Sequence, residues 1–176
     1  MLKTQPFPEP VTGPDGLDPA LFREGMSRVA AAVHVVTTDG PEGRAGFTAT
    51  AVAPVTDSPA ALLVCVNTSS RSAEALLANG VFCVNALGAG DAALADIFAG
   101  RTGLFGQDRF SAGRWGTLAT GSPFLTTGLV AFDCRLSDAR VVATHHVIIG
   151  EIAAIRIGEK SPALIYQDRR YRELKA

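Results

Sequence analysis

The segment from Arg44 to Ala51 reads Arg-Ala-Gly-Phe-Thr-Ala-Thr-Ala and carries no acid, no histidine and no metal-ligand spacing. Small residues of this kind let the backbone and short polar side chains lie against a flat ligand. The demanding chemistry would then be supplied by the ligand, and the protein would bind and orient it. We therefore predict that Thr48, Ala49 and Thr50 line a cofactor-binding site.

A second polar segment, residues 67–72, lies between a predicted strand and a predicted helix. It offers four hydroxyls, one guanidinium and the free amides of a helix start, a combination that suits a phosphate. Alternatively, a serine here only caps the helix and the arginine is solvated. Its place after the Arg44 to Ala51 strand favours the phosphate of a nucleotide-like cofactor. The candidate residues are Asn67, Ser70, Arg71 and Ser72.

His145 and His146 are adjacent in an apolar predicted strand, so their side chains should point to opposite faces. Only one of them can face a given site. The simpler interpretation is a partly buried structural histidine, and no third ligand is spaced to complete a metal site. His145 as a ligand-binding donor is the functional alternative, and we interpret His34 as structural.

Two segments, 105–110 and 168–171, place arginine beside aromatic residues outside the periodic stretches. Such pairs stack on planar ligands or bind phosphates, and equally often they only fix loops to a surface. Both interpretations stay open here. The sequence contains no Ser-His-Asp order, no paired-carboxylate signature, no Walker loop and no G-x-G-x-x-G, so hydrolase, kinase and Rossmann classes have no residue support.

The chain of 176 residues has a formal charge of -1 and 47% hydrophobic residues, which fits one ordinary domain with a sizeable core. Nucleic-acid binding is not expected at this charge, and no apolar run is long enough to span a membrane. The three cysteines lie singly in apolar runs and are expected to be small buried hydrophobes in a reducing, cytoplasmic setting.

Proline-rich residues 1–16 are predicted to form a flexible N-terminal arm, and residues 17–176 a single domain. Asp18 and Pro19 predict a helix start, and apolar residues at helical spacing predict that this helix packs on a sheet. A turn at 39–43 separates two strands of a hairpin. Strands are expected over 33–37, 45–52, 61–66, 81–85, 129–136, 145–157 and 163–166. Helices are expected over 72–79 and 91–99, and the many strands favour a mainly β fold closed into a barrel.

Taken together, these segments resemble the short-chain flavin reductases, the small partners of two-component flavin monooxygenases. The resemblance spans about residues 20–174 and includes the pyrimidine-utilisation and 4-hydroxyphenylacetate types. The matching segments are 31–52, 55–59, 62–67, 82–87, 98–103, 108–110, Trp115, 144–145, 150–152, Arg169 and Tyr171. Ala60 departs from the family pattern, which usually repeats proline after Pro59.

The resemblance implies a split β-barrel that binds FMN or FAD and oxidises NADH or NADPH. It implies a homodimer with flavin near the subunit interface, and a monooxygenase that receives the reduced flavin. By position, Thr48, Ala49 and Thr50 would line the flavin ring and ribityl chain. Asn67, Ser70, Arg71 and Ser72 would lie at the phosphate. Arg169 would complete the cofactor pocket, and His145 and Tyr171 would lie at the nicotinamide, with no residue acting as an acid or base.

Two alternatives stay open. The segments 98–104, 144–147 and 163–171 also resemble the flavin-dependent cobalt-corrin reductase of cobalamin synthesis, which reduces Co(II) corrins through its flavin. A non-catalytic flavin-binding module in the same barrel is the other alternative.

Overall fold

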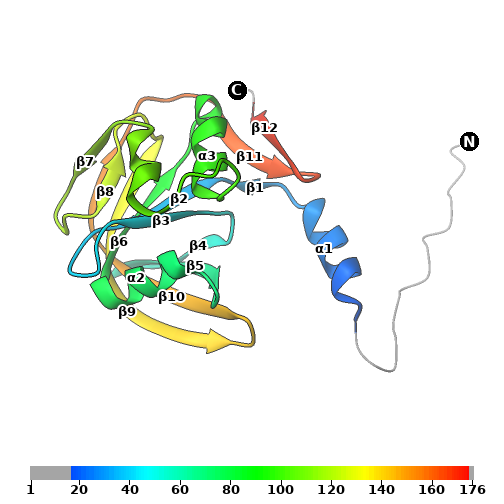
Figure 1. The fold of residues 1–176 in the computed structure, drawn as a ribbon, viewed down its shortest axis with the longest axis horizontal. Coiled ribbons are helices and arrows are strands. Elements are labelled where there is room, and N and C mark those ends of the chain that lie inside the picture. The colour runs from blue at the N-terminus through cyan, green and yellow to red at the C-terminus, as the bar shows by residue number, and fades with distance from the viewer. Residues whose placement is uncertain (1–16, 175–176) are drawn as a thin grey trace, which may run out of the picture.

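The computed structural model describes residues 17–174, and the predicted arm over residues 1–16 lies outside them. The helices are α1 (Pro19–Ser27), α2 (Arg71–Asn79) and α3 (Ala92–Phe98), with 3-10 turns η1 (Ala89–Asp91) and η2 (Gly106–Ser111). The strands are β1 (Ala31–Ala32), β2 (His34–Thr38), β3 (Ala45–Ala49), β4 (Val52–Asp57), β5 (Ala60–Asn67), β6 (Val81–Ala86), β7 (Trp115–Thr117), β8 (Pro123–Leu125), β9 (Val130–Val142), β10 (His145–Ile157), β11 (Ala163–Gln167) and β12 (Arg170–Leu174). The fold is mainly β, as predicted (Figure 1).

One antiparallel sheet of seven strands, in the order β3-β2-β6-β9-β10-β5-β4, forms the body of the molecule. Its two edge strands, β3 and β4, follow one another in the chain, and β3 also contacts β5. The sheet therefore curls round on itself and stays open between β3 and β4, which is the predicted split barrel. Smaller sheets, β1-β11-β12 and β7-β8, cover its outside.

Two apolar clusters hold the elements together. One fills the barrel, where Val64, Phe82 and Ile148 are fully buried and Leu76 packs in from α2. The other lies under α3, where Phe98 meets Phe110 and Trp115 edge-on at centroid distances of 5.0 and 5.6 Å. Burying large aromatic rings in this way stabilises α3 against β2 and β3.

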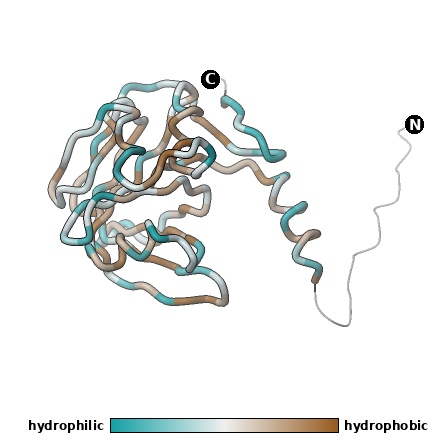
Figure 2. The backbone as a smooth tube through the Cα atoms, in the orientation of Figure 1, coloured by the Kyte–Doolittle hydropathy of each residue, from teal (hydrophilic) through white to brown (hydrophobic). Residues whose placement is uncertain are grey.

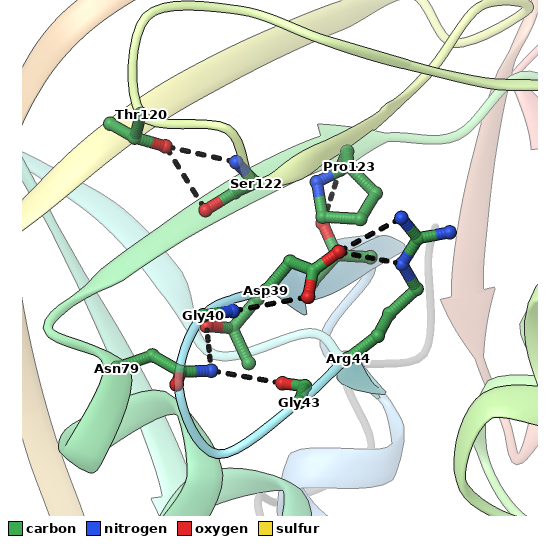
Figure 3. Close-up of polar contacts among 10 residues, drawn as sticks. Asp39, Gly40, Gly43, Arg44, Asn79, Thr120, Ser122 and Pro123 are labelled. Carbon is green, nitrogen blue, oxygen red and sulfur yellow. Dashed lines mark hydrogen bonds and ion pairs between the residues drawn. The ribbon is translucent and has the colours of Figure 1, made fainter.

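Gly46 in β3 allows α3 to approach the strand closely. A Cβ there would lie 2.8 Å from Phe98 Cε1 and 2.9 Å from the Val36 carbonyl oxygen, so a larger residue would displace backbone. The β2-β3 turn is fixed as well, because Asn79 donates to the Gly43 carbonyl and Arg44 pairs with Asp39 at 2.8 Å (Figure 3).

Buried polar groups attach the β7-β8 hairpin to the barrel. Asn85 accepts a hydrogen bond from the Leu125 amide at 2.7 Å, and the Thr37 hydroxyl donates to the Pro123 carbonyl. Asp133, which is fully buried, accepts from both the amide and the hydroxyl of Thr120. A buried carboxylate needs such donors, so this network fixes where the hairpin sits. The sequence did not predict β1, β4, β7, β8 or β12.

Helix α1 begins as predicted, with Asp18 accepting from the Ala20 amide at 2.8 Å, but it does not pack on the sheet. None of its residues is buried; Phe22 is 58% exposed and Met26 52%. Figures 1 and 2 show the helix standing clear of the barrel, with hydrophobic residues along it. The prediction that this helix packs on the sheet of its own chain was therefore wrong. Amphipathic spacing indicates that one face of a helix is covered, but it does not identify the surface that covers it.

Cys83 and Cys134 are buried as predicted, Cys65 is half-buried, and all three are free thiols. Burial raises the pKa of the Cys134 thiol to about 12, which keeps it protonated and unreactive. Within residues 17–174 no helix has the length and apolar character needed to cross a membrane.

Candidate functional site

A cavity of about 810 Å³ opens beside β3, at the open edge of the barrel. The ends of β3, β5 and α3, the start of α2 and the first residue of β10 form its wall. Its lining includes eight of the ten predicted site residues, namely Thr48, Ala49, Thr50, Asn67, Ser70, Arg71, Ser72 and His145. The volume is in the range usual for small-molecule sites.

The start of α2 forms one end of the cavity and offers hydrogen-bond donors there. Ser70 caps the helix, accepting from the Ala73 amide at 3.4 Å, so the capping interpretation of this residue also holds. The amides of Arg71 and Ser72 open the helix and have no intrahelical acceptors. The exposed Arg71 side chain makes no ion pair with residues 17–174. These donors and the helix dipole favour a phosphate here.

Arg109 adds a second cation at the same end. Its Nε donates to the Leu104 carbonyl and its Nη1 to the Gly46 carbonyl, both at 3.1 Å. The Ser72 hydroxyl donates to the same Gly46 oxygen at 3.0 Å, so the guanidinium lies beside the start of α2. Its Nη2 makes no hydrogen bond with the described residues. The sequence left Arg109 open between ligand binding and loop fixing; its two bonds to backbone carbonyls show loop fixing, and the side chain also lines the cavity.

The floor of the cavity is neutral. Ala49 is buried, and the Thr48 hydroxyl donates to the Ala95 carbonyl at 2.6 Å, which leaves its oxygen lone pairs able to accept from a ligand. Thr50 is exposed at the end of the strand. Among residues 17–174, no carboxylate lines the cavity, so these residues do not repel an anionic ligand there.

His145, the first residue of β10, lies exposed in the cavity wall and is paired in register with Asn67. Its Nδ1 is 2.9 Å from the Thr144 hydroxyl, which orients the ring and leaves Nε2 for a ligand. His146 is half-buried on the next position of the strand. His34 is away from the cavity lining, and burial lowers its pKa below the ordinary value, which suits its structural interpretation.

Tyr171 and Arg169 lie outside the main cavity. Tyr171 lines a hollow of about 180 Å³ that shares Thr48, Ala49 and Thr50 with it, and burial raises the pKa of the Tyr171 hydroxyl. The Tyr171 ring stands 5.4 Å from that of Tyr166.

Arg169 instead pairs with Glu24 of α1 at 2.8 Å, and this pairing lowers the pKa of the Glu24 carboxyl. The neighbouring amide of Asp168 donates to the Ser27 carbonyl. The β11-β12 turn thus holds the C-terminal end of α1.

The chain also matches a known protein family. A model described as "Flavin reductase like domain" matches residues 26–175. The chain belongs to this flavin reductase family. FMN reductase (NADH) RutF of Variovorax paradoxus is 50% identical over 93% of this chain and 92% of its own.

Among solved structures, a Haemophilus somnus protein is 42% identical, with a TM-score of 0.85 over 90% of this chain and all of its own. BorF, the flavin reductase component of a bacterial two-component tryptophan halogenase, is 28% identical, with a TM-score of 0.84 over 90% of this chain and 99% of its own. Both structures therefore share the fold of this chain over nine tenths of its length.

Proposed function

We propose that this chain is an NADH-dependent flavin reductase that transfers a hydride from the nicotinamide to FMN, with FAD as the other candidate flavin. The observation that carries the proposal is the cavity itself, which has a wall of small neutral residues and an end lined by two arginines and a helix start. A flavin mononucleotide has the same division into a planar ring and a phosphate. The names of the relatives support FMN and NADH as the pair.

The residues would divide the work as follows. Arg71 and Arg109 would hold the phosphate together with the free amides of Arg71 and Ser72 at the start of α2, since the Ser72 hydroxyl already donates to Gly46. Asn67 and Ser70, in the loop before the helix, would lie beside it. Thr48, Ala49 and Thr50 would support the ring and its ribityl chain.

The nicotinamide would enter between two walls. His145 would contact it from one side, and Tyr171 from the adjoining hollow. Arg169 lies outside this set, since its guanidinium is engaged by Glu24.

The bound flavin supplies the hydride-accepting ring, and the protein's part is positioning. A cavity without a carboxylate offers no strong general base, and direct hydride transfer needs none. Holding the two rings in contact and excluding water is the contribution expected of these side chains. Substitutions should therefore act mainly through ligand binding.

Steady-state NADH and NADPH oxidation, with and without added FMN or FAD, tests this proposal. Turnover that rises with free flavin supports a reductase that releases its product. Turnover confined to tightly bound flavin would favour the corrin-reductase alternative, and flavin binding without turnover would leave a non-catalytic module.

The reduced flavin would pass to a partner monooxygenase or halogenase, as the description of BorF suggests. We further place this reaction in the cytoplasm, where reduced thiols and nicotinamide cofactors coexist.

The chain is also proposed to work as a homodimer, with α1 of each copy covered by the other. Its exposed apolar residues, Leu21, Phe22 and Met26, need a partner surface. Light scattering of Phe22→Asp should then show monomers where the unaltered protein shows dimers, and an unchanged mass would contradict this.

A further inference from the structure

Phe105 is an exposed aromatic ring at the border of the main cavity. Its side chain is 70% exposed. Within residues 17–174 it is the only strongly exposed large hydrophobic residue that also lines this cavity. An isolated phenyl ring left in water beside a ligand site has a free face on which a planar group can stack.

The hydrogen bonds of Arg109 locate this ring at the phosphate end. Arg109 binds the carbonyl of Leu104, the residue before Phe105, through Nε. It binds the Gly46 carbonyl, which Ser72 also contacts, through Nη1. Phe105 is therefore tied to the same end as the start of α2. The hollow that holds Tyr171 opens instead along Thr48, Ala49 and Thr50.

The backbone on both sides of Phe105 is built to hold the ring at the rim. Gly103 and Gly106 have φ values of 76° and 52°, a region that glycine adopts without strain. The backbone changes direction at these two glycines, and the hydrogen bond from Arg109 fixes Leu104 between them. The segment is thus anchored at one point and presents one aromatic side chain.

Resting on the proposed function, we propose that Phe105 forms one face of a subsite for the adenine ring of a dinucleotide. FMN ends at its phosphate, whereas in FAD and NADH a second phosphate, a ribose and adenine continue beyond it. A group that stacks beyond the phosphate end therefore recognises adenosine phosphates and has nothing to contact in FMN. Both FAD and the nicotinamide cofactor contain an adenosine phosphate. An experiment must therefore decide which of the two places its adenine on Phe105.

Isothermal titration of FMN, FAD and NAD+ into the unaltered protein, Phe105→Ala and Phe105→Tyr tests the subsite. Stacking of a base on an aromatic side chain predicts that Phe105→Ala weakens an adenine-bearing ligand by about fivefold or more. FMN affinity should stay unchanged, and Phe105→Tyr, which keeps the ring, should behave as the unaltered protein. Loss confined to FAD identifies the flavin as the source of the adenine, and loss confined to NAD+ identifies the nicotinamide cofactor.

An equal loss of FMN and FAD affinity, or no loss for any ligand, would overturn the adenine subsite while leaving flavin binding by the unaltered protein intact. Failure of the unaltered protein to bind any flavin would instead overturn the proposed function, and the subsite with it.

Discussion

Arg109 gives the sharpest test of where the phosphate binds. In Arg109→Ala, two hydrogen bonds from a half-buried guanidinium to backbone carbonyls are lost. Each hydrogen bond contributes modestly to stability. The loss of both predicts a decrease of about 1–2 kcal/mol in the free energy of unfolding. For a domain of this size that corresponds to a fall of about 2–6 °C in Tm.

Binding should suffer more than folding. A hydrogen bond to a charged phosphate is worth about 1.5–3 kcal/mol, so the FMN Kd is expected to rise roughly 10- to 150-fold. Riboflavin carries the same ring without the phosphate, and its affinity should be unchanged. The assay is quenching of flavin fluorescence for both ligands, well below the Tm of the variant.

Arg114→Ala is the matched control, because Arg114 is exposed on the same connecting segment and lies outside the cavity lining. If Arg109→Ala weakens riboflavin as much as FMN, the guanidinium supports the ring end or the loop alone. Unchanged FMN affinity would place the phosphate elsewhere. Either result refutes the reasoning from the shared Gly46 contact.

Other predictions concern the nicotinamide, pH and the buried network. His145→Ala should raise the KM for NADH about fivefold, the loss of one hydrogen bond, and change FMN affinity less; an unchanged KM in steady-state kinetics would contradict its role. Burial lowers the pKa of His34 in the folded protein. As the pH is lowered from about 6.5, the unfolded chain takes up a proton before the folded chain does, so the free energy of unfolding decreases until the pH reaches the folded pKa. His34→Asn should flatten that part of the urea-midpoint profile, and a profile identical to the unaltered protein would exclude His34 as its source. Asp133→Ala leaves the two Thr120 donors unpaired and should cost about 2–4 kcal/mol in urea unfolding, whereas the exposed Asp138→Ala should cost nothing measurable.

Local patterns predicted the elements that carry the site. Thr48 and Ala49 end β3 and Thr50 follows it, and Ser70 to Ser72 form one helix start, so strand and capping signals a few residues long were enough to predict these elements. The turn at 39–43 and the Asn79-Gly80 helix end were equally local, and α2 ends as expected with Gly80 in the left-handed region.

Contacts between distant parts of the chain account for what was missed. Arg109 contacts Gly46, 63 positions away, and Asn85 contacts Leu125, 40 positions away. Neither contact produces a pattern in the local sequence around the residues that make it. Arg169 was expected at the cofactor, but it pairs with Glu24, 145 positions away. The amphipathic pattern of α1 was detected correctly, but it carries no information about the surface that covers the helix.

Anaerobic mixing of the protein and FMN with excess NADH, followed at the flavin absorbance band, tests the central claim most directly. Hydride transfer within the cavity predicts that the band bleaches at a rate that saturates with NADH, and far faster than in a mixture without protein. If the protein binds FMN and the band bleaches no faster than in free solution, the chain is a flavin-binding module and the reductase assignment is wrong.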